Sequence, residues 1–240
     1  MDSTLRRRKT SATASGVLET RVGHNPMSAL FWNTITEDMR LVLREFFNND
    51  IGQKFYLAGG TALSLQLGHR HSIDLDLFSP TEDIPSIRAS LEEALSALKP
   101  QLADSSWGNL VFVASNVRVG LYGYGYSMID PIVEEETLRL ASIRDIALMK
   151  MDAILSRANR KDFYDLYFIA QAVPLKELFE IAPKKYPSVR DFEVQVTKRL
   201  VYFDSADNDP DPIFLEPVSW KAVREYFMQQ AKEIEQGWLK

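Results

Sequence analysis

The segment 55–80 restricts the fold more than any other part of the chain. It contains a short apolar run, two glycines, a helical pattern and an alternating run, in that order. The apolar run over 55–58 predicts a buried strand, and the periodicity over 61–67 predicts a helix directly after it. The run over 73–77 alternates apolar and acidic residues, which predicts a second strand, because successive side chains of a strand point to opposite faces. The apolar face of this strand holds Ile73, Leu75 and Leu77, and the acidic face holds Asp74 and Asp76.

The acidic face of the second strand carries two carboxylates side by side, Asp74 and Asp76. Their charges repel, and each raises the proton affinity of the other unless a cation lies between them. Magnesium is commonly bound by one or two protein carboxylates together with substrate phosphates. The pattern therefore predicts a metal site for Mg²⁺, or for Mn²⁺ in its place, although a solvated acidic face is the commoner explanation of such a pair taken alone.

The glycine pair Gly59 and Gly60 lies where the first strand passes into the helix. Glycines let a backbone approach a phosphate closely, and a helix N-terminus presents free N–H groups and the positive end of a dipole. Thr61 adds a hydroxyl at the same place. Two glycines at such a position often form only a tight turn, but together with the two carboxylates they predict a site that binds phosphate and a metal ion.

The spacing of these residues resembles a known enzyme signature. The run Gly59-Gly60-Thr61, followed thirteen residues later by Asp74 and then by Asp76, is similar to the signature of polymerase-β-type nucleotidyltransferases. The fuller run over 70–77, with Arg70 and Ser72 as nucleotide-binding residues, resembles the AbiEii/AbiGii toxin family of that superfamily. The resemblance extends from about residue 28 to about residue 235. It implies an NTP substrate and an α/β (α+β) fold, in which a small mixed-sheet nucleotidyltransferase core is followed by an α-helical C-terminal lobe.

The rest of the chain divides into a mixed part and a helical part. Helices are predicted over 28–47 and 84–98, a hairpin of strands over 110–113 and 117–126, and short edge strands over 132–133 and 138–140. After these the pattern is helical over 142–157, 161–171, 174–186, 190–202 and 217–236, with a loop rich in proline and aspartate over 204–217. We therefore predict a nucleotidyltransferase core over 26–140 and a helical C-terminal lobe over 141–240.

Composition and charge restrict the class of protein. The 240 residues contain no cysteine, which excludes disulfides and thiolate metal sites, and no apolar run is long enough to span a membrane. We therefore expect a cytoplasmic protein without a membrane partner. Residues 1–25 carry five basic and two acidic side chains, which predicts a disordered basic tail of net charge +3. Because the whole chain has a net charge of −5, the remainder carries −8, which argues against broad, non-specific binding of nucleic acid.

Lys150 lies within the apolar stripe of the helix predicted over 142–157. Burying an unpaired ammonium group is costly, so either its charged end reaches solvent along the flexible stem, or it faces a cleft where an anion such as a nucleotide phosphate meets it. Asp162 and Asp165 lie on or beside the apolar face of the next helix. Aspartates near a helix start often cap the helix and complement its dipole, so the pattern alone leaves their role open.

A second part of the sequence resembles the C-terminal signature of the AbiEii family. The matching residues are 140–147, 149–153, Arg157 and 161–167. The resemblance implies that Lys150 binds a nucleotide phosphate and that an aspartate of the later helix takes part in catalysis. It does not choose between Asp162 and Asp165.

The strand over 117–121 departs from the polymerase-β-type pattern. Such enzymes commonly place a third carboxylate on a strand next to the metal-binding pair, but this strand has Arg118 or Gly120 at the matching place and no acid. The missing acid puts a full two-metal site in doubt.

Two further groups of residues have weaker patterns. His69, Arg70 and His71 are expected to form a basic rim beside the phosphate site, with Arg70 as the best phosphate contact. The tyrosine-rich run over 122–126 is able to stack on a nucleobase. Strand packing followed by a turn is the commoner role of such a run, and it is the one favoured here.

The residues and the resemblance together predict a magnesium-dependent enzyme that transfers a nucleoside monophosphate from an NTP to an acceptor hydroxyl. Asp74 and Asp76 would hold the metal, Gly59 and Gly60 would cradle the phosphates, and Lys150 would neutralise developing charge. The resemblance implies the toxin of a bacterial toxin–antitoxin or phage-defence pair, with tRNA as acceptor and an antitoxin protein as partner. The alternatives are a transferase that acts on a small molecule or a protein, and a degenerate member that binds a nucleotide or a partner without turnover.

Overall fold

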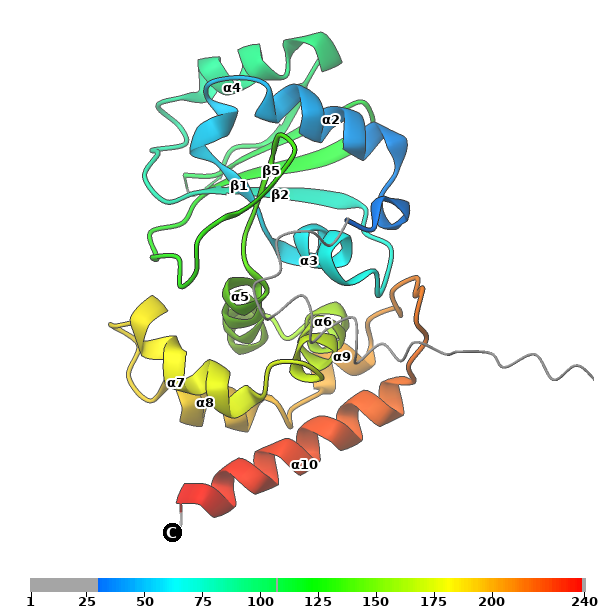
Figure 1. Cartoon of the computed structure of the whole chain (residues 1–240), viewed down its shortest axis with the longest axis vertical. Coiled ribbons are helices and arrows are strands. Elements are labelled where there is room, and N and C mark those ends of the chain that lie inside the picture. Colours follow the sequence, from blue (N-terminus) through cyan, green and yellow to red (C-terminus); the bar gives the residue numbers. More distant parts are fainter. Residues whose placement is uncertain (1–29, 107, 239–240) are drawn as a thin grey trace, which may run out of the picture.

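The structure is a computed structural model that describes residues 30–106 and 108–238. The basic tail predicted over 1–25 lies outside these residues, and so do the first positions of the helix predicted over 28–47. A mixed sheet lies at one end of the molecule and a group of helices at the other (Figure 1). The predicted fold class, a small mixed-sheet core followed by helices, is confirmed. The division into separate domains after residue 140 stays a prediction.

Seven strands form the sheet in the order β3-β4-β5-β2-β1-β7-β6. Their bounds are Tyr56–Leu57 (β1), Asp74–Ser79 (β2), Gln101–Asp104 (β3), Leu110–Ala114 (β4), Val117–Gly123 (β5), Val133–Glu135 (β6) and Leu138–Leu140 (β7). β2 runs parallel to β5 and antiparallel to β1, and β1 runs parallel to β7. The β2 positions that form the acidic face therefore lie in the middle of the sheet.

The alternation predicted over 73–77 is present except at its first position, residue 73. Leu75 and Leu77 are fully buried, as expected. Ile73, which we expected on the same apolar face, precedes the strand and is 73% exposed. The ladder between β2 and β5 begins only at Asp74, so no neighbouring strand holds Ile73 against the core.

Helices cover the sheet and form the other end of the molecule (Figure 1). Their bounds are Glu37–Phe47 (α2), Gly59–Leu67 (α3), Arg88–Ala94 (α4), Ile143–Ser156 (α5), Arg160–Ala170 (α6), Leu175–Lys185 (α7), Phe192–Arg199 (α8), Asp204–Asp207 (α9) and Trp220–Trp238 (α10), with short 3₁₀ helices at Trp32–Thr34, Gly52–Lys54 and Ser96–Leu98. None of the helices in the described ranges is long and apolar enough to cross a membrane.

Several elements differ from the predicted ones for local reasons. The helix predicted over 28–47 is broken before α2, because the Thr36 hydroxyl accepts a hydrogen bond from the backbone N–H of Met39 and caps a new helix there. The edge strand β3 was not predicted, since its residues are all exposed and show no apolar alternation. β7 was expected at an edge but lies inside the sheet, between β1 and β6. α9 interrupts the loop predicted over 204–217.

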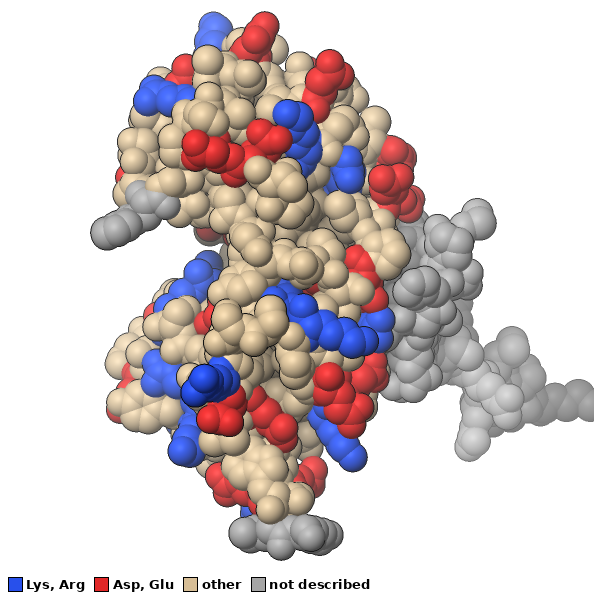
Figure 2. Space-filling model, turned by 90° about the vertical axis from the view of Figure 1, so that its left-hand side faces the viewer, with Lys and Arg blue, Asp and Glu red and all other residues tan. Residues whose placement is uncertain are grey.

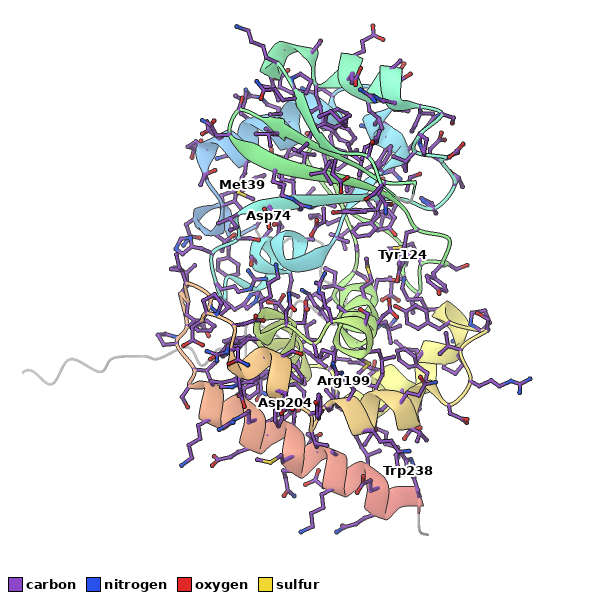
Figure 3. The ribbon with its side chains drawn as sticks, turned by 180° about the vertical axis from the view of Figure 1, so that it is seen from behind. Met39, Asp74, Tyr124, Arg199, Asp204 and Trp238 are labelled. Carbon is purple, nitrogen blue, oxygen red and sulfur yellow. The ribbon has the colours of Figure 1, made fainter. Side chains whose placement is uncertain are left out.

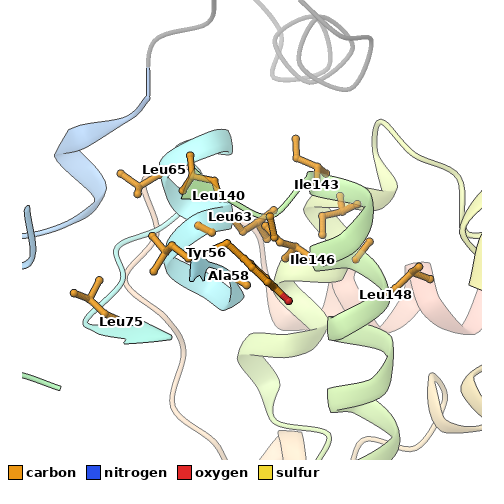
Figure 4. Close-up of a cluster of buried hydrophobic side chains, with 14 of the residues drawn as sticks. Tyr56, Ala58, Leu63, Leu65, Leu75, Leu140, Ile143, Ile146 and Leu148 are labelled. Carbon is orange, nitrogen blue, oxygen red and sulfur yellow. The ribbon is translucent and has the colours of Figure 1, made fainter. Parts of the chain in front are cut away.

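α3 lies between the sheet and α5, where apolar side chains from all three layers pack together (Figure 4). Leu63 and Leu65 of α3 are fully buried, and so are Leu140 of β7 and Ile146 of α5. The helix that follows the two glycines is therefore held on both sides, and its N-terminus has a fixed place beside β2.

A buried ion pair joins α5 to α7. The ammonium of Lys185 lies 2.8 Å from a carboxylate oxygen of Asp145, and neither side chain is exposed. Asp145 also accepts hydrogen bonds from the backbone N–H groups of Ile129 and Asp130, which precede β6. Ser142 caps α5, as its spacing to Asp145 predicted. These bonds fix the start of α5 against the segment that leads out of β5.

Candidate active site

A cavity of about 530 Å³ lies between the acidic face of β2, which holds Asp74 and Asp76, and α5. The surface is visibly hollowed between the part that holds the sheet and the part that holds the helices, and Lys and Arg side chains lie on the helical side of the hollow (Figure 2). One end of the cavity is lined by Gly59, Gly60, Asp74, Asp76 and Lys150. Cavities of this size are typical of small-molecule sites. The structure thus brings together most of the residues that the two sequence signatures singled out.

Asp74 and Asp76 lie on the same face of β2, and both are half-buried in the cavity wall. Burial raises the pKa of Asp76, the charge of Lys150 opposes that shift, and the charge of Asp74 adds to it. Two oxygen-donor side chains that repel each other at the edge of a cavity suit a divalent cation whose other ligands are water and phosphate. In the described part of the chain, no three acidic or histidine side chains lie close enough to hold a metal ion by themselves.

Gly59 brings the start of α3 against this carboxylate pair. Its φ of +65° is a conformation that side chains other than glycine rarely adopt. A Cβ at this position would lie 2.9 Å from an oxygen of Asp76. The glycine is thus required both by the backbone turn and by the closeness of the carboxylate, which is a more specific reason than the tight turn considered from sequence.

Gly60, Thr61 and Ser72 join α3 to neighbouring segments. A Cβ on Gly60 would clash with the guanidinium of Arg70, so the absence of a side chain lets this cation lie beneath the helix start. The Thr61 hydroxyl lies 2.7 Å from the Ser72 hydroxyl and also donates a hydrogen bond to the backbone carbonyl of Asp74. These hydroxyls line the cavity, but their hydrogen bonds serve mainly to fix α3 against β2.

Beneath the cavity, Asp165 of α6 is surrounded by cationic and imidazole groups. Arg70 donates two hydrogen bonds to its carboxylate at 2.7 and 2.8 Å, and the ammonium of Lys150 lies at 2.7 Å. His69 lies at 2.9 Å, and burial lowers the pKa of this imidazole, so the neutral ring donates through Nε2. Burial by itself would raise the pKa of Asp165, but the charges of Arg70 and Lys150 outweigh it and hold the pKa well below its usual range.

Asp162 forms the second half of the same cluster. Its carboxylate lies 2.9 Å from the ammonium of Lys150 and accepts two hydrogen bonds from Arg157 at 2.9 and 3.0 Å. Burial would raise the pKa of Asp162, but the charges of Lys150 and Arg157 lower it overall. Because both aspartates are fully buried and ionised, neither presents a free oxygen to the cavity.

These contacts correct two interpretations of the sequence. Lys150 is not an unpaired lysine, since two carboxylates of α6 hold its ammonium while the side chain also lines the cavity. His69 takes no part in a rim, because it is buried against Asp165 and does not line the cavity, whereas Arg70 is buried against the same carboxylate but still lines the cavity. Only His71 of that run is partly exposed. The pattern of one sequence segment did not reveal these partners, because they come from another helix.

The register of the sheet confirms that β5 supplies no third acid. Arg118 pairs with Asp74, and Gly120 pairs with Asp76. Tyr122 folds back over Gly120, and its phenol lies beside Asp76 and Arg118. A phenol therefore occupies the place beside Asp76 where a third carboxylate was looked for.

Sequence reasoning considered base stacking by the tyrosines of 122–126 but favoured strand packing, and it did not predict that Tyr122 and Tyr124 line the far end of the cavity. Phe78, Tyr122 and Tyr124 line one wall there, and Met149 and Asp152 of α5 line the other. In Figure 3, Asp74 and Tyr124 lie on the side of the sheet that faces the helices. The signal available in the sequence was the helical spacing of the residues at 149, 152, 153 and 156, which places them on one face of α5.

A family model described as nucleotidyl transferase AbiEii toxin, of a type IV toxin–antitoxin system, matches residues 40–106 and 114–238. The chain belongs to the AbiEii nucleotidyltransferase toxin family. The match includes both carboxylates of β2, the lysine of α5 and both aspartates of α6. Membership supports a transferase that moves a nucleoside monophosphate, and it confirms the family resemblance stated from the sequence.

Three individual proteins are similar to this chain in sequence or in fold. An uncharacterized protein of Aquifex aeolicus strain VF5 is 34% identical over 205 residues, which cover 83% of this chain and 97% of that protein. A Helicobacter pylori protein described as a nucleotidyltransferase has a similar fold, with a TM-score of 0.51 and 17% identity over 83% of this chain and 92% of its own. MenT4, a nucleotidyltransferase toxin from Mycobacterium tuberculosis, is 15% identical over 94% of this chain and 92% of its own, with a TM-score of 0.48.

Proposed function

We propose that this AbiEii family member transfers a nucleoside monophosphate from an NTP to a hydroxyl of tRNA, as the toxin of a bacterial toxin–antitoxin or phage-defence pair. The observation that carries the proposal is the arrangement of Asp74, Asp76 and Lys150 around one cavity, next to the N-terminus of α3. This arrangement offers a cation site, a fixed ammonium and a phosphate-binding helix start within one space.

Each of these groups has a role in the transfer. Asp74 and Asp76 fit as ligands of one Mg²⁺, which would supply charge neutralisation at the phosphates when bound. The backbone N–H groups that follow Gly59 and Gly60 would bind phosphate oxygens. An ammonium has three donors, and the carboxylates of α6 engage two of those of Lys150, which leaves one for a phosphate.

Asp162 and Asp165 act as positioning residues in this proposal. Their lowered pKa values make them weak proton acceptors, and their oxygens are all engaged by cations and His69. Their function would be to hold Lys150 and Arg157 in place. Arg70, which lines the cavity beneath the helix start, would contribute positive potential at the phosphates.

The transfer itself replaces a phosphoanhydride bond of the NTP by a phosphate ester bond to the acceptor. The acceptor hydroxyl oxygen forms a bond to the α-phosphorus and loses its proton to the surrounding water. The bond between the α-phosphorus and the oxygen that bridges it to the β-phosphorus breaks, and pyrophosphate leaves with the electron pair. The fixed cations of the site would stabilise the charge that develops on the leaving pyrophosphate.

The choice of tRNA rests on the family and on the charges around the cavity. Arg118, Arg157 and Lys161 are exposed beside it, although the chain as a whole is acidic. A local path of cations suits a polyanionic acceptor that must reach a cavity in an acidic protein. The toxin would meet NTPs, tRNA and its antitoxin in the cytoplasm.

The test is to incubate the protein with each NTP labelled at the α-phosphorus, magnesium and total cellular RNA. We expect label in the tRNA fraction, and none with Asp76→Asn. Label in protein or in a small molecule would show that the acceptor is that molecule and not tRNA. The presence of Tyr122 in place of a third acid favours one alternative function, a protein that binds a nucleotide without turnover. Binding of NTP without transfer of label to any acceptor would support that alternative.

A further inference from the structure

The aromatic end of the cavity has no role in the transfer described above. Phe78 and Tyr122 lie side by side there, with ring centroids 5.1 Å apart and planes inclined by 30°. Tyr124 stands nearly edge-on to Phe78, at 5.4 Å and 72°. All three rings line the cavity. The role of strand packing favoured from sequence is thus incomplete for Tyr122 and Tyr124.

The spacing along β2 relates this aromatic wall to the metal site. Asp74, Asp76 and Phe78 alternate with buried residues and share one face of the strand. Two strand residues span roughly 7 Å, so the ring of Phe78 follows the carboxylate of Asp76 by about the length of one sugar. An NTP whose phosphates lie at Asp74 and Asp76 would therefore carry its base to the aromatic wall.

The wall is held rigidly from the helical side. The hydroxyl of Tyr124 lies 3.0 Å from the hydroxyl of Tyr186, and the ammonium of Lys185 lies over the ring of Tyr124 at 5.2 Å. Tyr126 packs against Tyr186 with centroids 4.8 Å apart. A ring fixed in this way loses little conformational entropy when a ligand stacks on it.

The opposite wall is formed by α5, where Met149, Asp152, Ala153 and Ser156 face the cavity. The thioether of Met149 is a soft contact for an aromatic base. Asp152 is half-buried, and its carboxylate has no hydrogen-bond or ion-pair partner among residues 30–106 and 108–238. Burial raises the pKa of Asp152, and the charge of Arg157 opposes this shift.

From these contacts we infer that the cleft between Phe78 and Tyr124 on one side and Met149 and Asp152 on the other binds the nucleobase of the NTP. The inference rests on the proposed function, and it names the class of nucleotide. An ionised carboxylate only accepts hydrogen bonds, so Asp152 suits a base that presents an amino group. Cytosine carries an amino group where uracil carries a carbonyl oxygen, and the carbonyl would face Asp152 without a donor.

The test compares the affinities of CTP, UTP and inorganic tripolyphosphate, each with magnesium, for the whole protein. We expect the wild type to bind CTP about tenfold more tightly than UTP, the low end of what a good base contact supplies. Asp152→Asn should narrow this difference, because a carboxamide both donates and accepts. The binding of tripolyphosphate, which has no base, should not change.

The stacking contact is tested with a matched pair of variants. Tyr124→Leu removes the ring, and we expect it to weaken binding of both nucleotides about tenfold, while tripolyphosphate binding stays the same. Tyr124→Phe keeps the ring and should retain most of the affinity. Melting curves check that both variants fold.

Three results would overturn the inference. If the affinities for CTP and UTP are equal and no variant changes them, the cleft does not bind the base. The proposed NMP transfer would not be affected by that result. Losses in Tyr124→Leu or Asp152→Asn that affect only the KM for RNA would assign the cleft to the acceptor instead. A wild-type protein that binds neither NTP nor tripolyphosphate would contradict the proposed function itself, and the base site with it.

Discussion

Asp165 is the most heavily engaged side chain of the buried charge cluster, with Arg70, Lys150 and His69 around it. Taking ions out of water costs several kcal/mol each, and here that cost is offset only while all the partners are present. A change to one member therefore leaves the others buried without a counter-charge.

Asp165→Asn is expected to lower the free energy of unfolding by about 3 to 5 kcal/mol, the cost of breaking a buried ion pair. Urea denaturation of the purified protein without nucleotide measures this. Asp152→Asn is the matched control, because that carboxylate has no such partner, and its effect should stay below about 1 kcal/mol. If the two variants lose the same stability, the cluster does not hold the two parts of the molecule together.

The pKa shifts of the cluster predict how stability depends on pH. Asp162 and Asp165 have lowered pKa values in the folded protein, so near and below the ordinary aspartate value of about 3.9 the unfolded chain binds more protons than the folded one. Their stabilisation is therefore complete above that pH and is lost as the pH falls through the folded values. The unfolding free energy of the wild type between pH 7 and pH 3 should fall more steeply than that of Asp165→Asn, and parallel curves would refute the assigned ionisation.

The sequence alone placed Lys150 correctly on an inward-facing stripe but could not identify its partners. Asp162 and Asp165 lie on another helix, and their position on that helix suggested capping as readily as a functional role. Periodicity shows which face of a helix turns inward, but it does not show which face of a second helix meets it. The same limit explains why Arg70 was expected at the rim.

At the scale of elements, α3 begins where β1 ends, and Gly59 is the residue on which this junction depends. Gly59→Ala would place a methyl group against Asp76 in a backbone conformation that costs about 1 to 2 kcal/mol for other residues. We expect a loss of stability of that size and a loss of transfer activity of about a hundredfold, because the carboxylate is displaced.

Gly125→Ala is the control for this variant, since nothing lies within 4 Å of a Cβ at that position. Thermal melting and the rate of NMP transfer should both stay near wild type in Gly125→Ala. Normal activity of Gly59→Ala would show that the close approach of α3 to Asp76 is not needed.

Elements with strong periodicity were predicted well, and their ends were not. The hairpin around Ser115 and Asn116 is present, because both residues take the positive φ values that such a turn requires. The start of β2 was placed one residue early, because the strand begins where pairing with β5 begins, which depends on a segment far along the chain. β3 had no signal, since an exposed edge strand needs no apolar face.

At the scale of the whole molecule, an acidic chain keeps exposed cations beside its cavity. Arg157 and Lys161 are exposed and line it, and Arg118 is exposed on β5, where it pairs with Asp74. Arg160, which we expected to join them, is engaged by the segment after α8, with hydrogen bonds to the backbone carbonyls of Ala206 and Asp207 and to the carboxylate of Asp211. These hydrogen bonds use three of the five N–H donors of its guanidinium and hold Arg160 in a role that supports the fold.

We expect RNA binding to weaken steeply with added salt, because phosphate contacts release counterions. Replacing Arg118 and Lys161 together with alanine should reduce the slope of log Kd against log salt concentration by about one to two, if each contacts one phosphate. Lys221→Ala removes an exposed charge of α10 that does not line the cavity and should leave the slope unchanged. An unchanged slope in the double variant would place the RNA elsewhere.

The central claim is that this protein moves the nucleoside monophosphate part of an NTP. The most direct test runs two reactions with magnesium and cellular RNA, one with NTP labelled at the α-phosphorus and one with NTP labelled at the γ-phosphorus. We expect the α label in the acceptor, the γ label in pyrophosphate, and neither movement with Asp76→Asn. A γ label in the acceptor, or NTP that binds and is never cleaved, would contradict the claim.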